Sequence, residues 1–456
     1  MTGSYKVVIC GAGIAGISAA YYLAVKQGIQ DVLLVDQGAP LSLTSDKSTE
    51  GYRNWWPGPG NAMVALMNRS IDLLEDLAQE SGDIFQLSRR GYLYISADPG
   101  KIPEMLRSAE TISSLGAGPL RIHEGGLSSS SYIPHQAHGY GGSPDGADLI
   151  LDPSLLQEYF PYLTDRAAVA LHVRRAGWFS GQQLGIYLLE CARQAGVRYT
   201  QARITGISLR LGRVQAVQLE DGRSIRTRCF VNAAGPMLKQ VGAMLGVDLP
   251  VYTEPHMKVA FKDTLGTVPR DAPLLIWSDP QRLPWSESER ELLSEDESSH
   301  SLLGVMPPGV HTRPEGGRGS NILLMLWEYN TQPIEPVWPL PYDPDYPDVL
   351  LRGLSTMLPG LKAYFNRSER PYLDGGYYTR TRENRPLVGP LPVKGAFLIG
   401  ALSGFGLMSA CAAGELLAQQ ISEGPLPGYA PAFMLERYQD PAYIQNIANL
   451  EDTGQL

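Results

Sequence analysis

The chain has 456 residues, a formal net charge of −9 at pH 7 and four cysteines. This length exceeds one ordinary hydrophobic core, so it predicts two domains, or one domain interleaved with another. The acidic balance argues against nucleic acid as the main partner and against a polybasic membrane patch.

The first apolar run, residues 7–25, reads VVICGAGIAGISAAYYLAV and carries no charge. A membrane-spanning helix needs about 20 apolar residues, so length alone leaves a membrane anchor open. However, each glycine would cost about 1 kcal/mol in such a helix, and Lys6 and Lys26 end the run on both sides. A secretion signal would need a more positive start and a cleavage site of small residues. The composition therefore favours a βαβ unit, and no membrane span is expected.

The glycines in this run have the spacing G-x-G-x-x-G between an apolar strand and a helix-forming stretch. Gly11 would allow a tight turn, Gly13 the approach of a pyrophosphate, and Gly16 close packing of helix on strand. The pyrophosphate would bind at the helix N-terminus, and Asp36, at the end of the next strand, can accept hydrogen bonds from ribose hydroxyls. The predicted dinucleotide contacts are Gly11, Ala12, Gly13, Ile14, Ala15, Gly16, Asp36 and Gln37.

Three later segments indicate which dinucleotide binds. Residues 181–222 are predicted to form a helix, two strands and a hairpin, and residues 228–237 a strand that ends in small residues. Small residues let the backbone approach a flat ring system closely. Residues 395–421 predict a strand, a loop with Ser403 and Gly404, and a helix whose N-terminus suits the electron-rich end of a reduced isoalloxazine. A nicotinamide dehydrogenase is the alternative, but it leaves this loop without a role.

Two stretches predict irregular surface structure. Residues 284–300 are acidic and rich in serine, which is typical of a solvated insertion, with a partner-docking loop as the alternative. Residues 331–348 are rich in proline and predict an irregular connection into a helix.

The cysteines and histidines predict neither disulfide bonds nor a metal site. The cysteines lie scattered in apolar runs without a C-x-x-C pair, which predicts buried thiols in a reducing compartment and a cytoplasmic location. The seven histidines show no H-x-x-x-H or H-E-x-x-H spacing, so no metal site is expected.

Taken together, these segments resemble the flavin-dependent amine oxidoreductases of the D-amino-acid oxidase, glycine oxidase, sarcosine oxidase and dimethylglycine dehydrogenase type. The stretches VNAAGPMLKQVGAMLGVDLPVYTEPH (231–256) and TRTRENRPLVGP (379–390) are particularly similar. The resemblance implies an α/β, discontinuous Rossmann-like FAD-binding domain with an inserted, mostly antiparallel β-sheet substrate domain of α+β type. The FAD-binding domain is expected at 1–85, 150–245 and 370–435, the substrate domain at 86–149 and 246–369, and a C-terminal tail at 436–456.

The resemblance also implies FAD as the cofactor. Relatives attach the flavin through a histidine in an F-H-P-G-like motif or through a cysteine before a late Tyr-Thr pair. Trp56 and Gly376 stand at these positions here, so FAD is expected to be non-covalent. Dehydrogenases of this group often continue into a folate-binding domain, and no folate partner is expected for this chain. The further predicted FAD contacts are Ser48, Thr49, Ile204, Ala233, Ala234, Gly235, Gly376, Ser403, Gly404, Phe405, Gly406, Leu407 and Met408.

Three residues are predicted to act on the substrate by analogy with this family. Arg53 falls where sarcosine oxidase has a carboxylate-binding arginine, and a guanidinium matches a carboxylate. His256 corresponds to a substrate-facing histidine of dimethylglycine dehydrogenase and would hold the amine or accept its proton. Tyr378 matches the active-site tyrosine of sarcosine oxidase. For each of them a structural role is the alternative.

Other candidates have weaker support. Arg313 could bind a carboxylate or cap a hairpin. Met408 stands where sarcosine oxidase has a second cationic ligand, which argues against a small N-methyl amino acid as substrate. Trp55, Trp56 and Trp178 could form an aromatic cage for an alkylated amine or belong to the core.

The resemblance implies an enzyme that oxidises the C–N bond of a secondary or tertiary amine or amino acid, similar to sarcosine or dimethylglycine. A hydride would pass from the carbon beside nitrogen to the flavin N5, and O2 or an electron acceptor protein would take the electrons. The alternative is a non-catalytic, flavin-binding regulatory or assembly subunit.

Overall fold

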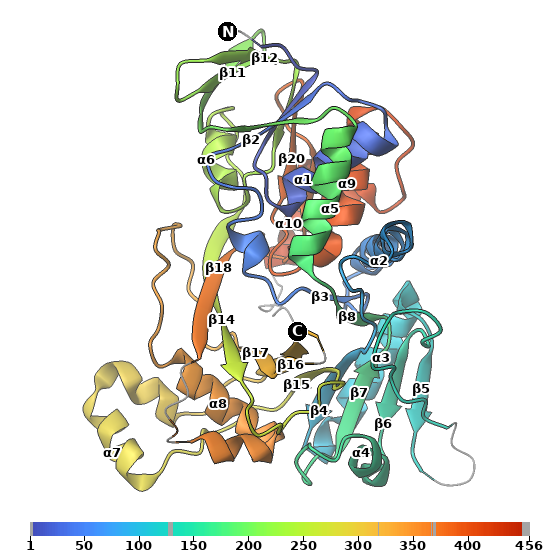
Figure 1. Ribbon diagram of the computed structural model, residues 1–456, viewed down its shortest axis with the longest axis vertical. Helices are drawn as coiled ribbons and strands as arrows, with labels where there is room; N and C mark the ends of the chain where they lie inside the picture. Colours follow the sequence, from blue (N-terminus) through green and yellow to red (C-terminus); the bar gives the residue numbers. More distant parts are fainter. Residues whose placement is uncertain (1–2, 126–130, 318, 366, 368–370, 449–456) are drawn as a thin grey trace.

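The computed structural model describes residues 3–125, 131–317, 319–365, 367 and 371–448 of the chain. Figure 1 shows two regions arranged along the long axis of the molecule. The upper region holds a mostly parallel sheet covered by helices, and the lower region holds a larger sheet.

The sheet of the upper region has six strands. In spatial order they are β19 (Leu387–Pro390), β20 (Ala396–Gly400), β13 (Cys229–Asn232), β1 (Val7–Cys10), β2 (Val32–Asp36) and β9 (Arg198–Gln201). All neighbours pair in parallel except β19, which is antiparallel to β20. The central strand is apolar on both faces because Val7 and Ile9 pack in one core and Val8 packs in another.

Helices and a small second sheet cover the two faces of this sheet. Helices α1 (Ile14–Tyr21), α5 (Gly181–Gln194) and α9 (Gly406–Ile421) lie together, and α2 (Ala62–Ser81) packs on α9. The other core includes residues of β10 (Ile204–Arg210), β11 (Arg213–Leu219), β12 (Ser224–Arg226) and α6 (Leu238–Ala243). The predicted βαβ unit is therefore the centre of this region.

The turn between β1 and α1 needs glycine at two positions. Gly11 has a φ of +110°, and a Cβ there would lie 2.2 Å from the backbone oxygen of Ala233. A Cβ on Gly16 would lie 1.9 Å from the backbone oxygen of Gly11, so any side chain would push the helix away from the strand. This geometry agrees with the tight turn and the close helix packing expected from the G-x-G-x-x-G spacing.

The lower region is built on a nine-stranded, mostly antiparallel sheet. In spatial order its strands are β18 (Tyr372–Arg380), β14 (Tyr252–Lys262), β17 (Ile322–Leu326), β16 (His311–Glu315), β15 (Leu274–Trp277), β4 (Tyr92–Ser96), β7 (Val169–Val173), β6 (Ala147–Ile150) and β5 (Leu120–His123). The long strands β14 and β18 extend from this sheet toward the upper region (Figure 1). They therefore connect the two regions.

The remaining elements surround these two sheets. Helix α8 contributes to the apolar core on one face of the nine-stranded sheet, and β3 pairs with β8 between the two regions. The bounds of these elements are β3 (Gly51–Arg53), β8 (Ala176–Trp178), α3 (Ile102–Ile112), α4 (Pro153–Tyr159), α7 (Glu287–Glu295), α8 (Tyr346–Met357) and α10 (Pro441–Ala448).

Two strands of the nine-stranded sheet lie in segments that were expected to belong to the FAD-binding domain. Strand β7 lies within 150–245 and strand β18 within 370–435, but both form hydrogen bonds in the sheet of the lower region. The difference has a physical cause. The residue pattern of a strand indicates which of its faces are buried, but the choice of neighbouring strand depends on contacts between distant segments.

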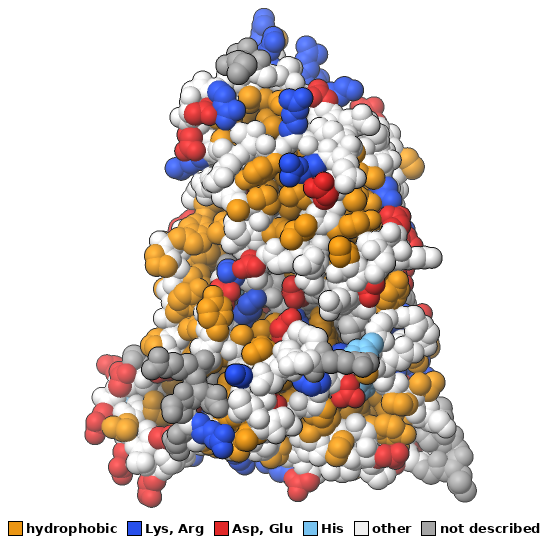
Figure 2. All heavy atoms as spheres, viewed as in Figure 1, with side chains coloured by type: hydrophobic (Ala, Val, Ile, Leu, Met, Phe, Trp, Pro, Cys, Tyr) orange, Lys and Arg blue, Asp and Glu red, His pale blue; other side chains and the backbone are white. Residues whose placement is uncertain are grey.

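The acidic stretch 284–300 contains a short helix and not only a loop. Helix α7 begins with a capping box of Ser286 and Glu289, and no residue of this helix is buried. Figure 2 shows acidic side chains gathered at the lower left of the molecule, where Figure 1 places α7. In the part of the chain that the structure describes, no helix is long and apolar enough to cross a membrane.

Candidate active site

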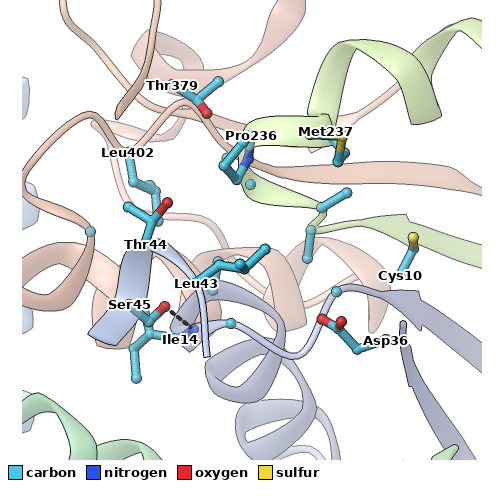
Figure 3. A pocket seen from close by; sticks show the side chains of 18 of the residues that line it. Cys10, Ile14, Asp36, Leu43, Thr44, Ser45, Pro236, Met237, Thr379 and Leu402 are labelled. Atoms are coloured by element: carbon cyan, nitrogen blue, oxygen red, sulfur yellow. Dashed lines mark hydrogen bonds between the residues drawn. The ribbon is translucent and has the colours of Figure 1, made fainter. Parts of the chain in front are cut away.

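A cavity of about 350 Å³ opens beside the G-x-G-x-x-G turn, and we call it the glycine-turn cavity. It extends from the end of β2 to the loop between β20 and α9 (Figure 3). Among the predicted cofactor contacts, those that line it are Gly11, Gly13, Ile14, Ala15, Asp36, Gln37, Ser48, Ile204, Ala233, Ala234, Gly235, Ser403, Gly404, Gly406 and Leu407. Three others, Thr49, Phe405 and Met408, line a neighbouring cavity, whereas Ala12, Gly16 and Gly376 are not on the wall of either.

One end of the glycine-turn cavity has donors and a carboxylate suited to a dinucleotide. The Asp36 carboxylate accepts hydrogen bonds from the backbone N–H groups of Ala12 (2.7 Å) and Gly38 (2.8 Å). At the start of α1, the backbone N–H of Ile14 donates to Ser45 Oγ over 3.0 Å (Figure 3). The helix N-terminus attracts an anion, and a Cβ on Gly13 would enter the space beside Ser45. These features fit a pyrophosphate with a ribose near Asp36.

Residues that the sequence did not single out also line this cavity. Between Ala39 and Ser45 the chain passes over the cavity, and Met237 and Gln240 line it from the segment after β13. The motif ends before these residues, and short apolar or hydroxyl side chains in a loop carry no recognisable pattern. Only the proximity of residues 39–45 to Asp36 in the sequence could have indicated them.

At the far end, the loop between β20 and α9 has an unusual backbone. Ala401 and Ser403 both have a φ of +50°, and the N–H of Ser403 donates to the oxygen of Thr379 over 3.0 Å. Non-glycine residues adopt this left-handed conformation at an energetic cost, and such residues cluster at functional sites. The loop lines both the glycine-turn cavity and the neighbouring cavity.

The neighbouring cavity encloses about 30 Å³, and we call it the Arg53 cavity. Tyr378 and Gly404 line both cavities, so the two adjoin. Its wall carries one guanidinium and one carboxylate among mostly apolar and aromatic groups. The lining residues are Thr49, Arg53, Tyr92, Leu274, His311, Leu326, Glu328, Tyr378, Gly404, Phe405 and Met408.

Arg53 is held by aromatic rings at the end of β3. Its side chain is buried, and its Cζ lies 4.6 Å from the centre of the Trp56 ring and 5.7 Å from that of Tyr92. Trp56 in turn packs edge to face on Phe405, with 5.0 Å between the ring centres. A guanidinium fixed in this way is oriented before a carboxylate binds, which lowers the entropic cost of binding.

His256 lies behind the wall of the Arg53 cavity and is not one of its lining residues. Its ring stacks on Tyr378 with 3.7 Å between the ring centres. Its Nδ1 lies 3.3 Å from Glu328 Oε1 and its Nε2 lies 3.5 Å from Glu254 Oε2. Burial lowers the pKa of His256, but the two carboxylates outweigh burial and raise it above its usual value. The imidazole therefore favours its charged form.

Glu328 and His311 are cavity residues that the sequence analysis did not identify. Both lie on or next to neighbouring strands, β16 and β17, and neither is part of a recognisable motif. Burial lowers the pKa of His311, whose Nδ1 lies 2.9 Å from the oxygen of Gly309. The cavity wall thus combines a neutral imidazole with the charged groups of Arg53 and Glu328.

Arg313, which could bind a carboxylate or cap a hairpin, has structural partners. Arg313 lies 2.5 Å from Glu315 and 3.4 Å from Glu50, and it donates to the oxygen of Thr49 over 2.8 Å. Its guanidinium also lies over Trp178, 5.1 Å from the ring centre. These contacts describe an arginine that ties β16 to the loop before β3.

The chain matches the family described as FAD dependent oxidoreductase over residues 6–420, and it belongs to this family. It is 24% identical over 432 residues to mitochondrial dimethylglycine dehydrogenase of Rattus norvegicus, covering 92% of this chain and 43% of that protein. It is 26% identical over 271 residues to the mitochondrial pyruvate dehydrogenase phosphatase regulatory subunit of Mus musculus, covering 59% of this chain and 27% of that protein. The chain therefore spans less than half the length of these curated relatives.

A solved structure has the same fold. L-proline dehydrogenase from P. horikoshii superposes with a TM-score of 0.72 at 19% identity, covering 99% of this chain and 100% of that chain. The predicted family, the predicted fold class and FAD as cofactor are confirmed by these comparisons. The glycine turn, the α1 N-terminus and Asp36 supply the features that such a cofactor needs.

We expect acid precipitation to release the FAD into the supernatant. Trp56 is buried against Phe405 and Gly376 has no side chain, so neither can form a bond to the flavin. Cys10 lines the glycine-turn cavity, but burial and the Asp36 carboxylate raise its pKa to about 12, which keeps it a thiol. The absorbance of the supernatant and pellet tests this, and yellow colour retained in the washed pellet would contradict it.

Proposed function

We propose that this protein is an oxidoreductase that oxidises the C–N bond of a small amine or amino acid bearing a carboxylate. The observation that supports this most is the Arg53 cavity, because it adjoins the glycine-turn cavity and presents a buried guanidinium. A guanidinium recognises a carboxylate through paired hydrogen bonds. A substrate anchored there would have its reacting carbon near the boundary between the two cavities.

Some of the cavity residues have clear physical roles in such a reaction. Arg53 binds the carboxylate, Tyr378 forms part of the wall shared with the glycine-turn cavity, and the aromatic rings around Arg53 exclude water. Bound FAD would accept one hydride, which carries both electrons of the oxidation. From the neutral amine, the carbon loses the hydride and the nitrogen loses a proton, which gives an imine that water hydrolyses to a carbonyl compound and an amine. A substrate that enters as an ammonium ion loses one further proton first. O2 or an electron acceptor protein then takes the two electrons.

A second candidate is a regulatory or assembly subunit that binds FAD without turnover. The similarity to the pyruvate dehydrogenase phosphatase regulatory subunit supports it. A regulatory protein would have no need of a guanidinium and a carboxylate facing one small cavity beside the cofactor.

Product analysis separates the two candidates. The purified protein would be incubated with small amines, with and without a carboxylate, together with O2 or an artificial electron acceptor, and the products identified by mass spectrometry. The proposal predicts a carbonyl compound and a dealkylated or free amine from a carboxylate-bearing substrate. Unchanged amines in every mixture would favour the regulatory candidate.

A further inference from the structure

Glu328 lies between two cavities. It lies two residues after the end of β17 and lines the Arg53 cavity on one side. On the other side it lines a cavity of about 170 Å³, which we call the Asp343 cavity because Asp343 is part of its wall. A quarter of the Glu328 side chain is exposed, at 25%. Because Glu328 is part of the wall of the Arg53 cavity, a ligand in this cavity can contact it, although most of the side chain is buried.

A row of alternating charges stands behind Glu328. Arg380 binds Glu254 over 2.7 Å, Glu254 lies 3.5 Å from His256 Nε2, and His256 Nδ1 lies 3.3 Å from Glu328. The stacking of His256 on Tyr378 fixes the ring within this row. Burial raises the pKa of Glu328, but His256 and Arg380 outweigh burial and lower it below its usual value. The carboxylate on the cavity wall is therefore ionised at neutral pH.

We propose that Glu328 is the residue that recognises the substrate's ammonium group. With Arg53 on the same cavity wall, the site then selects a zwitterion: a small amino acid or N-alkyl amino acid that enters with a positive nitrogen and a negative carboxylate. His256 is a positioning residue in this account, because it acts on the ligand through Glu328. The inference rests on the proposed function and assigns a residue that recognises its substrate.

Three ligands of nearly the same shape test the recognition without turnover. 2-Aminoisobutyrate carries both charged groups, pivalate has a methyl group in place of the ammonium, and tert-butylammonium has a methyl group in place of the carboxylate. None of them has hydrogen on its central carbon, so none can give up a hydride there. Their affinities for the FAD-loaded protein would be measured by titration calorimetry.

The substitution Glu328→Gln keeps the size of the side chain and removes its charge. We expect it to weaken binding of 2-aminoisobutyrate and tert-butylammonium by about 10- to 100-fold, the range for hydrogen bonds to charged groups. Pivalate affinity should not fall. Asp343→Asn is the matched control, because Asp343 lines the Asp343 cavity but not the Arg53 cavity, and it should leave all three affinities unchanged.

The pH dependence of tert-butylammonium affinity tests whether His256 positions Glu328 or has only a structural role. Arg380, His311, Tyr378 and Tyr346 also interact with Glu328 and are unchanged in His256→Gln. Without the imidazolium, the largest influence that lowers the pKa of Glu328 is lost, so this pKa rises. The acid-side loss of tert-butylammonium affinity should therefore begin at higher pH than in the wild-type protein. This ligand stays protonated throughout, because alkylammonium groups have pKa values of about 10.

Several results would overturn this inference. They are equal losses for pivalate and the ammonium ligands in Glu328→Gln, an unshifted pH profile in His256→Gln, or a wild-type protein that binds neither ammonium ligand. If Glu328→Gln fails to retain FAD, the affinities of the wild-type protein for the three ligands still show whether the site binds an ammonium group. If the protein oxidises amines but Glu328→Gln does not change the affinity for ammonium ligands, the inference is wrong and the proposed function stands. If the protein binds the ammonium ligands but oxidises no amine, only the proposed function is wrong.

Discussion

A Gly13→Val variant should purify folded but colourless, whereas the wild-type protein should be yellow with bound FAD. A Cβ at Gly13 meets only Ser45 Oγ, at 3.2 Å, and the backbone there has no positive φ. The fold therefore tolerates a side chain, but the side chain would stand in the glycine-turn cavity where a pyrophosphate must approach the backbone. The flavin absorbance per protein and the circular dichroism spectrum would be compared.

The other glycines of the motif provide a contrast. Gly16→Ala should destabilise the fold itself, because its Cβ would lie 1.9 Å from the oxygen of Gly11. Gly141→Val is the control, since no atom lies within 4 Å of a Cβ built at that exposed position. FAD bound normally by Gly13→Val would show that the cofactor does not approach this turn.

An Arg53→Met variant should lose about 2–4 kcal/mol of binding free energy for a substrate that carries a carboxylate, while keeping its FAD. The guanidinium is buried on the cavity wall between Trp56 and Tyr92, and methionine preserves much of the apolar contact with these rings. Rapid mixing under anaerobic conditions would measure flavin reduction as a function of substrate concentration. If the carboxylate also positions the carbon, the rate at saturation should fall as well.

The comparison that decides this prediction uses substrates with and without the carboxylate. An amine that lacks the group should react almost equally with the wild-type protein and with Arg53→Met. Arg313→Met is the control variant: Arg313 pairs with Glu50 and Glu315, so its loss should lower thermal stability and leave the preference for a carboxylate intact. Equal losses for both kinds of substrate in Arg53→Met would mean that Arg53 supports the loop and does not bind substrate.

The dinucleotide half of the fold could be predicted because its signals are local. The strand, the glycine turn, the helix and Asp36 follow one another within a single βαβ unit, and Gly11 and Gly16 have a steric reason that the backbone geometry makes visible. The larger sheet has no comparable signal. Some of its strands pair with partners far away in the sequence, as β4 does with β15, so the limits of the second domain depend on contacts that no local pattern encodes.

The candidate site also contains residues that the sequence could predict and residues that it could not. Arg53 and Tyr378 lie on the cavity wall, where the resemblance led us to expect substrate contacts, but Glu328 and His311 had no motif to reveal them. His256 was expected to face the amine, and it lies instead behind Glu328. Its strand register explains this position, because on β14 it is Glu254 that pairs with Tyr378, while His256 pairs with Gly376. A register between two distant strands is not readable from either strand alone.

The most direct test of the account is the absorbance of the purified, FAD-containing protein during anaerobic addition of small amines. We expect amino acids and N-alkyl amino acids with both an ammonium group and a carboxylate to bleach the oxidised flavin. Matched amines without a carboxylate should bleach it far less. If no amine reduces the flavin, although a chemical reductant such as dithionite does, the proposed oxidation of a C–N bond in the Arg53 cavity would be contradicted.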